Sequence, residues 1–431
     1  MMIMGGKLTL IKSVLESLPS YFLSLYKAPA KIIDCLEAKR RRFLWGSKDD
    51  KDKMAWVAWD QVLSSKVDGG LGLCPLKVSN LALLAKWWWR YKVEEKRLWR
   101  RFIQAIHHTP KVGAAIPYNK ALNGTWASLA KLDNYMTYAN VSLKGAIKGV
   151  LGNGKSIRFW LDTWLHERPL MEVYPNLFRF EAKKDCLVAE RCIIRNGQKT
   201  MDWNWKSAII GGSEAAELFH ILMDLFQVEV KPCSDKWVWS KEEDGSFSVA
   251  SVKKALMSPL PASRGSMKFD WNAWVPIKVK IFGWRAMLNR LPTMDMLIKR
   301  KIVTGPNRCS LCLGAVESID HVFAACMVSS VIWQKISLWC RISPIFAFSF
   351  KDLLEVHKYI PGNKTKKKVI QSIIVVACWC LWKARNEMIF SNRPVKVEKI
   401  MGDVMAYSFL WIKSRAKKVE LDWNRWKVFL L

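Results

Sequence analysis

The chain lacks long apolar runs, and this absence excludes a membrane-spanning protein. A membrane helix needs roughly 20 apolar residues, whereas the longest candidate, residues 373–382, lies between two lysine-containing segments. We therefore predict a buried helix there and no membrane partner. Residues 1–13 contain two lysines that interrupt any apolar segment, so they are not typical of a secretory signal. We expect an intracellular protein, located in the nucleus or the cytoplasm.

Carboxylates are scarce where catalysis would need them. A nucleic-acid polymerase gathers two or three carboxylates around two metal ions, but the one Asp-Asp pair, Asp49-Asp50, lies in a polar loop flanked by lysines. The acids after residue 365 do not lie in an alternating strand, which argues against a ribonuclease-type cluster. We predict that this chain is not an enzyme and has no small-molecule substrate.

Acidic residues are also few relative to basic ones, and the balance points to a polyanion. The chain has 69 Lys and Arg against 37 Asp and Glu, which gives a net charge of +32. A compact domain with such a charge repels itself unless a polyanion is near. We predict non-specific, phosphate-driven binding of RNA or DNA; the alternative is a basic surface that serves solubility alone. Most of the 24 tryptophans are expected in cores.

Four residues have the spacing of a metal site. Among only six histidines and eleven cysteines, one set reads C-x2-C-x8-H-x4-C: Cys309, Cys312, His321 and Cys326. Three thiolates and one imidazole form the Cys3His set that Zn²⁺ favours in closed structural sites, so we predict one structural zinc ion. Gly314 would supply a positive φ to the turn. The alternative is that these are unligated core cysteines. Disulfides are not expected, because the cysteine count is odd.

The hydrophobic pattern predicts an α+β, predominantly α-helical, multi-domain protein with short β-hairpins and a small Cys3His zinc knuckle between helices. We predict four segments: helical residues 1–110, mixed residues 111–264, a zinc-binding domain at 265–345 and a basic helical region at 346–431. The expected elements include helices at 8–18, 31–44, 76–101, 278–291 and 365–418, with Thr293 capping a helix that ends near 301, and a hairpin that pairs 236–239 with 246–249 across an Asp-Gly turn.

One motif invites a different interpretation. Residues 149–156 fit G-x-x-x-x-G-K-[ST], the phosphate-binding P-loop. That loop works only between a buried strand and a helix whose first N–H groups face the phosphates. Because Ile157, Phe159 and Leu161 alternate, we predict a strand after the motif and a hairpin turn at Gly-Asn-Gly-Lys, which leaves no P-loop.

Eight basic residues are the predicted phosphate contacts. They lie in basic stretches of the expected helices: Arg40, Arg41, Arg42, Arg90, Arg97, Lys278, Lys280 and Arg285. In the expected helix at 76–101, Lys86, Arg90, Arg97 and Arg101 would share one face. Trp284 could stack on a base, although core packing is the preferred interpretation.

Several blocks together resemble a known family. They include Gly5–Leu15, Leu18–Tyr21, Arg42–Gly46, Trp56–Trp59, Gly69–Leu73, Asn80–Trp87, Gly152–Gly154 with Phe159–Trp164, and Trp382–Asn386 with Phe390. These blocks resemble the region downstream of the polymerase palm in plant-type non-LTR (LINE-like) retrotransposon reverse transcriptases. Residues 269–339, with Trp284-Arg285, Leu291-Pro292-Thr293, the four ligands and Trp333, resemble the zinc-binding domain of that family.

The resemblance implies a nucleic-acid-handling tail. Family members carry a palm with an Asp-Asp motif, and often an endonuclease, upstream of the segment that resembles Gly5–Leu15. We therefore expect this chain to be a catalytically empty carboxy-terminal fragment of an RNA-directed DNA polymerase, without ribonuclease H. The other hypothesis is a protein-interaction scaffold organised by zinc, with no nucleic-acid role.

Overall fold

The computed structural model describes residues 4–48, 51–52, 54–107, 115–122, 124–195, 198–207, 211–258, 269–416 and 420–430. Asp49-Asp50, predicted to be a solvated loop, lies outside the described residues. The chain divides into two compact units. Unit 1 comprises residues 1–13, 40–73 and 263–431, and unit 2 comprises residues 14–39 and 74–262. The four predicted segments stay a prediction about the sequence.

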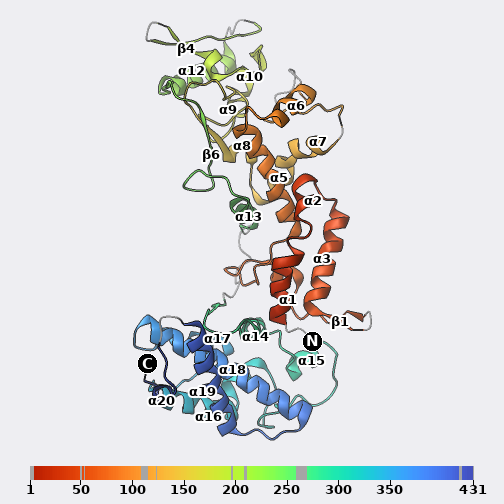
Figure 1. The fold of residues 1–431 in the computed structure, drawn as a ribbon, viewed down its shortest axis with the longest axis vertical. Coiled ribbons are helices and arrows are strands. Elements are labelled where there is room, and N and C mark those ends of the chain that lie inside the picture. The colour runs from red at the N-terminus through yellow and green to blue at the C-terminus, as the bar shows by residue number, and fades with distance from the viewer. Residues whose placement is uncertain are drawn as a thin grey trace. The chain divides into compact units, whose positions relative to one another are not determined.

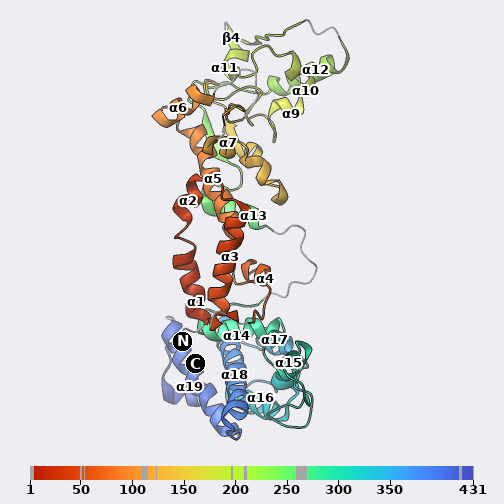
Figure 2. The ribbon, with the colours of Figure 1, turned by 90° about the vertical axis from the view of Figure 1, so that its right-hand side faces the viewer.

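Unit 1 is built around one long buried helix, α18. Its helices and strands are α1 (Met4–Leu10), β1 (Ser47–Lys48), β2 (Lys51–Asp52), α4 (Trp59–Leu63), α14 (Ile277–Met287), α15 (Met294–Lys299), η4 (His321–Ala325), α16 (Met327–Cys340), α17 (Phe350–Tyr359), α18 (Lys364–Ser391), α19 (Val397–Arg415) and α20 (Trp423–Lys427). Helix α18 packs against α14, α16, α17 and α19 (Figure 2). Its middle, from Ile373 to Trp382, is almost wholly buried, as predicted. Within the described residues, no helix is both long and apolar enough to cross a membrane.

Unit 2 is centred on α5. Its elements are α2 (Ser20–Leu25), α5 (Leu76–Val93), α6 (Leu98–His107), α7 (Thr125–Ala130), η2 (Leu132–Tyr135), η3 (Thr137–Ala139), α8 (Leu143–Ala146), β3 (Ile147–Val150), α9 (Leu170–Val173), α10 (Pro175–Phe180), α11 (Val188–Arg191), β4 (Cys192–Arg195), β5 (Gln198–Met201), α12 (Gly212–Phe226), β6 (Lys236–Trp239) and α13 (Val249–Met257). Two further helices, η1 (Ile11–Leu15) and α3 (Ala30–Trp45), have residues in both units. Helix α5 packs against α2, α7 and α13 (Figure 1).

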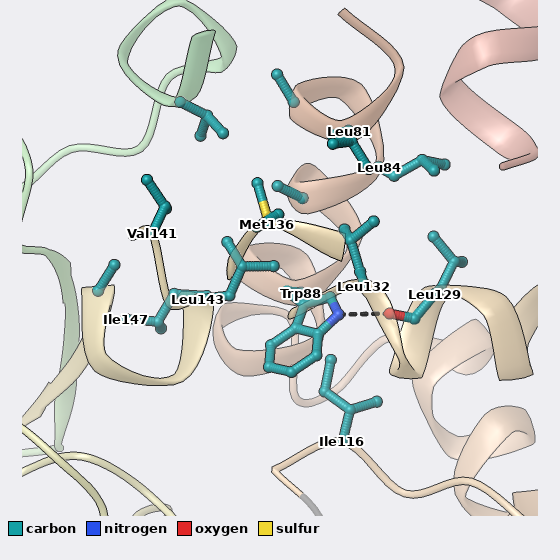
Figure 3. Packing of buried hydrophobic residues seen from close by; sticks show 14 of the residues in the cluster. Leu81, Leu84, Trp88, Ile116, Leu129, Leu132, Met136, Val141, Leu143 and Ile147 are labelled. Carbon is teal, nitrogen blue, oxygen red and sulfur yellow. Dashed lines mark hydrogen bonds between the residues drawn. The ribbon is translucent and has the colours of Figure 1, made fainter. Parts of the chain in front are cut away.

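A tryptophan anchors the core of unit 2. Trp88 of α5 is buried, and its indole N–H donates to the carbonyl of Leu129 at 2.7 Å. Leu132, Leu143 and Ile147 belong to the same cluster of buried side chains (Figure 3). An indole buried in this way contributes a large apolar area while its polar N–H stays paired. The core thus fixes α5 against the segment that leads into β3.

The strands are few and short, which confirms the predicted α+β, mostly helical class. The sheets each have two antiparallel strands: β1 with β2, β3 with β6, and β4 with β5. In the β3–β6 pair, Ile147 lies opposite Trp239 and Val150 opposite Lys236. This pairing corrects the predicted hairpin of 236–239 with 246–249. The chain does turn back, since the Trp239 N–H donates to the Gly245 carbonyl at 2.8 Å, but the residues paired with β6 are 86 to 92 positions upstream.

The prediction of one helix over residues 76–101 is wrong. Helix α5 ends at Val93 and α6 begins at Leu98. The Glu94 carboxylate accepts a hydrogen bond from the indole of Trp99 at 2.9 Å, and the Trp99 ring packs edge-on against Trp87 at 5.5 Å. This packing overrides the helical propensity of the sequence. The four predicted basic residues therefore do not share one helix face.

The predicted strand at 157–161 is also wrong. Ile157, Phe159 and Leu161 are buried as an alternating strand would require, but Trp160 is buried too. The Asp162 N–H donates to the Arg158 carbonyl at 3.2 Å, and the Arg158 N–H donates to the Asp162 carboxylate at 2.9 Å. These bonds close a turn where the sequence pattern predicts an extended strand.

Candidate metal centre

Four side chains of unit 1 converge on one point. The ligand atoms of Cys309, Cys312, His321 and Cys326 all lie within 4.8 Å of one another, and Cys312 Sγ is 3.3 Å from His321 Nε2. Cys309 and Cys326 are fully buried, whereas the other two are partly buried. Among the residues that the structure describes, this is the one group of three or more His, Cys, Asp or Glu side chains suited to a metal ion.

A tight turn brings the first two cysteines together. The Leu313 N–H donates to the Cys309 carbonyl at 2.8 Å, and the Cys309 N–H donates to the Ala315 carbonyl at 2.7 Å. Leu313 adopts a left-handed φ of 59°, which costs a non-glycine residue about 1–2 kcal/mol. The sequence assigns this role to Gly314, so the predicted position is wrong by one residue.

A π-helical turn places the other two ligands. The Cys326 N–H donates to the His321 carbonyl at 2.7 Å, which closes η4 and brings two residues five positions apart to one site. Cys326 then precedes α16. A hydrogen bond from the Cys309 thiol does most to hold the pKa of Cys326 below its usual value. Hydrogen bonds from the backbone N–H groups of Val328 and Ser329 lower this pKa further. A helix N-terminus therefore favours the thiolate form that binds metals.

The donor set fits Zn²⁺. With zinc–sulfur bonds of about 2.3 Å and zinc–nitrogen bonds of about 2.0 Å, neighbouring ligand atoms of a tetrahedron are roughly 3.5–3.8 Å apart, close to the separation of Cys312 and His321. Burial lowers the pKa of His321, although the charge of Glu317 opposes the shift. The neutral imidazole, which is the metal-binding form, is thus favoured. Four protein ligands leave no open position for water, which is typical of structural zinc.

Glu317 connects the zinc knuckle to its surroundings, a role that no pattern in the sequence predicts. Its carboxylate is fully buried and accepts hydrogen bonds from the Ser310 N–H at 3.3 Å and the Ser310 hydroxyl at 3.0 Å. The same carboxylate accepts from the Met294 N–H at 2.9 Å. Since Ser310 lies between Cys309 and Cys312, Glu317 joins the ligand turn to the start of α15.

The partner of Glu317 is Arg385 of α18. The two side chains form an ion pair, and Arg385 is only 3% exposed. Burial opposes ionisation of Glu317, but the hydrogen bond and charge of Arg385 outweigh it and keep its pKa below the usual value. Arg385 belongs to the Trp382–Asn386 block, but its partner is 68 residues away, beyond the reach of any local pattern. The prediction that Thr293 caps α15 is wrong, because its side chain makes no capping hydrogen bond. Glu317 instead accepts the hydrogen bond from the Met294 N–H at the start of that helix.

The predicted phosphate contacts are divided between the units. Unit 1 contains Arg40, Arg41, Arg42, Lys278, Lys280 and Arg285, and unit 2 contains Arg90 and Arg97. Arg41 and Arg42 are exposed. Arg40 is only 2% exposed, which is a poor location for a phosphate contact.

Cations of unit 1 gather beside tryptophans. The Lys278 ammonium lies 5.6 Å from the centre of the Trp411 ring. Burial, together with the charges of Lys66 and Arg415, lowers the pKa of Lys280. A cluster in which cations repel one another is stabilised by an incoming anion.

A second cluster surrounds Trp56. The guanidinium groups of Arg285 and Arg300 lie 5.6 and 4.6 Å from its ring centre. Burial and the charge of Arg300 lower the pKa of Arg285 to about 10, so Arg285 is still a cation at neutral pH. Its guanidinium also donates to the Arg290 carbonyl at 2.9 Å.

The remaining predicted residues differ in availability. Arg90 is engaged, since its guanidinium makes two hydrogen bonds to Glu94 at 2.7 and 3.0 Å, whereas Arg97 is exposed. Trp284 is completely buried and donates to the Gly69 carbonyl at 2.7 Å. Core packing, the preferred interpretation of Trp284, is therefore correct.

The P-loop-like motif forms a loop that binds a carboxylate of the chain itself. Asp235 accepts hydrogen bonds from the N–H groups of Gly152 at 2.7 Å, Gly154 at 2.9 Å and Ser156 at 2.8 Å. Gly154 has a φ of +68°, and a Cβ there would lie 2.8 Å from the backbone of Ala189. The glycine thus serves close packing of the loop. The N–H groups that a P-loop offers to phosphate are already occupied.

Comparison with known proteins agrees with this geometry. Residues 247–333 match the family model described as zinc-binding in reverse transcriptase. The match confirms the predicted resemblance of residues 269–339 to a zinc-binding domain of reverse transcriptases. All four candidate ligands lie within the matched residues, which begin before the predicted domain of 265–345 and end within it.

Two relatives come from Arabidopsis thaliana. The first, named "Putative ribonuclease H protein", is 31% identical over 398 residues, which cover 90% of this chain and 61% of the relative. The second, named "Uncharacterized mitochondrial protein", is 28% identical over 158 residues, which cover 36% of this chain and 97% of the relative. The chain thus spans about three fifths of the length of the first relative. The comparisons thus show similarity to a reverse transcriptase zinc-binding domain within the chain and to these two plant proteins.

Proposed function

We propose that this chain is a nucleic-acid-binding part of a non-LTR (LINE-like) retroelement reverse transcriptase, with a structural zinc ion at Cys309, Cys312, His321 and Cys326. The observation that carries the proposal is the closed Cys3His set inside a reverse transcriptase zinc-binding domain. The net charge of +32 supports RNA or DNA as the partner. The bound ion would hold the turn of Cys309 to the start of α16.

The zinc content of the purified chain tests the metal site. We expect about one zinc ion per chain, as in other closed four-ligand sites, and its loss in Cys309→Ser. Cys233→Ser is the matched control, because Cys233 is exposed and lies outside the ligand set. A well-folded wild-type chain without zinc would overturn the proposed site.

Binding measured against salt tests the nucleic-acid role. Each phosphate contact releases counterions, so log Kd should change with log salt by about 0.7–0.9 per contact. The cation clusters beside Trp56 and Trp411 favour several such contacts. A slope near zero would contradict phosphate-driven binding.

We propose further that the chain has no catalytic centre of its own. A zinc ion with four protein ligands cannot activate water. Primer extension on an intact template with Mg²⁺, and hydrolysis of an RNA–DNA hybrid, should both give no product. The hybrid assay is included because one relative is named as a ribonuclease H protein. Product in either assay would refute this part of the proposal.

A protein-interaction scaffold is the second candidate, and an apolar groove in unit 2 favours it. The groove has a volume of about 610 Å³ and includes Trp87, Leu98, Trp99 and Phe102. Leu98 is 78% exposed and Phe102 63% exposed. Exposed apolar side chains of this kind often mark protein-binding surfaces. Absence of nucleic-acid affinity at moderate salt would favour the scaffold.

A further inference from the structure

Unit 2 contains a cleft whose wall includes the P-loop-like segment. The cleft has a volume of about 970 Å³ and lies among the end of α5, the turn that follows it, the loop after β3 and the start of β6. Its basic lining residues are Lys92, Lys96, Arg97, Lys155 and Lys236. Of these, only Arg97 is among the phosphate contacts that the sequence predicts. We call this feature the α5–β6 cleft.

The acids of the α5–β6 cleft are already engaged within the chain. The Asp235 carboxylate accepts four hydrogen bonds from the loop, including one from the Ser156 hydroxyl at 3.0 Å. Glu94 binds Arg90 and Trp99, and Glu95 lies 3.6 Å from Arg100. Their negative charges are therefore largely compensated by groups other than the cleft lysines.

The cations are in the opposite situation. Lys96, Arg97, Lys155 and Lys236 are all exposed, and none of them has an ion-pair partner within the described part of unit 2. Lys92 is paired with Asp162 deeper in the unit. Four unpaired cations around one concave surface create a positive potential that attracts an anion.

The shape of the site restricts which anion fits. A nucleoside triphosphate would need the N–H groups of residues 152–156, and Asp235 occupies those of Gly152, Gly154 and Ser156. The cations instead come from three separate segments along the cleft, and the partly buried rings of Trp89 and Trp237 line it as well. Cations that follow a groove together with aromatic rings are typical of sites for single-stranded nucleic acid.

We infer that the α5–β6 cleft binds the phosphodiester backbone of a single-stranded nucleic acid through Lys96, Arg97, Lys155 and Lys236. The inference rests on the proposed nucleic-acid function and assigns unit 2 a contact surface of its own. Lys155, the lysine of the P-loop-like motif, contacts a phosphate of the nucleic-acid backbone there and not the phosphates of a free nucleotide.

The test compares two triple variants of the full chain by fluorescence anisotropy. The cleft variant is Lys96→Ala, Lys155→Ala and Lys236→Ala. The control is Lys120→Ala, Lys206→Ala and Lys254→Ala, which removes the same charge from exposed lysines of unit 2 outside the cleft. The probe is a labelled single strand of about 20 nucleotides, titrated from about 50 to about 300 mM KCl.

We expect the cleft variant to bind about tenfold or more weakly, with a log–log salt slope shallower by about 2, since three contacts at about 0.7 each are lost. The control should lose less affinity and keep more of the slope. Equal zinc content and equal thermal unfolding of both variants verify that they are folded. Excess Mg-ATP should not displace the strand.

The outcomes separate the inference from the proposed function. If wild type binds with a steep salt slope and the two variants behave alike, the cleft inference is overturned and the proposed function stands. If wild type shows no salt-dependent binding, both are overturned. Displacement of the strand by micromolar Mg-ATP would assign the cleft to a free nucleotide and contradict the inference.

Discussion

At the scale of single residues, Asp162 is a buried charge of unit 2 that pairs with two cations. Its carboxylate pairs with Lys92 and with the Arg158 guanidinium at 2.8 Å, and its side chain is 2% exposed. Burial alone would raise the pKa of Asp162, but the charges of Arg158 and Lys92 hold it well below its usual value. One buried carboxylate thus pairs with two cations.

Replacing Asp162 should be far more damaging than replacing Lys92. Asp162→Asn removes the ion-pair partner of the buried Lys92 and one counter-charge of Arg158, and we expect a loss of about 3–5 kcal/mol in the free energy of unfolding. Lys92→Met keeps the Arg158–Asp162 pair and removes a buried charge, so its cost should be clearly smaller. Urea unfolding of both variants measures the difference, and equal losses would contradict this account.

The lowered pKa of Lys92 also predicts that stability depends on pH. Burial, reinforced by the charge of Arg158, lowers the pKa of Lys92 from 10.5 to about 7. Between these values the unfolded chain binds a proton that the folded chain does not, so this lysine makes stability rise with pH from about 7 to about 10. Unfolding free energy of wild type should therefore increase relative to Lys92→Met over that range, and parallel curves for the two proteins would refute the prediction.

The metal ligands and Glu317 show what a sequence can predict about single residues. The four ligands lie within 18 residues of one another and keep a recognisable spacing, so the set could be found without a structure. Glu317 has no such signal, because its partners Met294, Ser310 and Arg385 come from separate segments. The same holds for Asp235, whose role depends on a loop about 80 residues upstream.

At the scale of elements, local patterns predicted helices well and interruptions poorly. Helices α3 and α14 lie close to where the apolar periodicity places them. The break between α5 and α6 depends on Trp99 packing against Trp87. The β3–β6 pair depends on a strand far away in the sequence. Both are products of tertiary contacts, which no local pattern contains.

Helix caps give a prediction at this scale. Ser349 caps α17: its hydroxyl accepts from the Asp352 N–H at 3.2 Å, while the Asp352 carboxylate accepts from the Ser349 N–H at 2.9 Å. Ser349→Ala should cost about 1 kcal/mol. Thr293→Val should cost nothing or stabilise slightly, because the buried Thr293 hydroxyl has no hydrogen-bond partner within the described residues. Thermal unfolding compares the two, and a larger loss for Thr293→Val would show that its hydroxyl caps α15.

At the scale of the whole molecule, the metal site belongs to one of two separately packed units. The ligands and the Glu317–Arg385 pair lie in unit 1, whereas the core around Trp88 lies in unit 2. Binding of a structural zinc ion is largely folding free energy. Loss of the ion should therefore lower the stability of unit 1 more than that of unit 2.

Removal of zinc should destabilise unit 1 selectively. With a chelator present, amide hydrogen exchange should accelerate in η4, α15 and α16, which contact the knuckle, and stay nearly unchanged in α5 and α13. Mass spectrometry of peptides from both units provides the measurement, with unit 2 as the internal control. Uniform acceleration across the chain would show that the two units unfold together.

The contact between Asp235 and the loop at residues 152–156 has a further consequence. A carboxylate that the fold holds beside these N–H groups has an effective concentration there of about millimolar or more. A dissolved anion must compete with that concentration for the same N–H groups. A chain can therefore keep the full sequence motif of a phosphate-binding loop and still not bind phosphate there. The folded chain supplies a carboxylate that competes with phosphate for the same N–H groups.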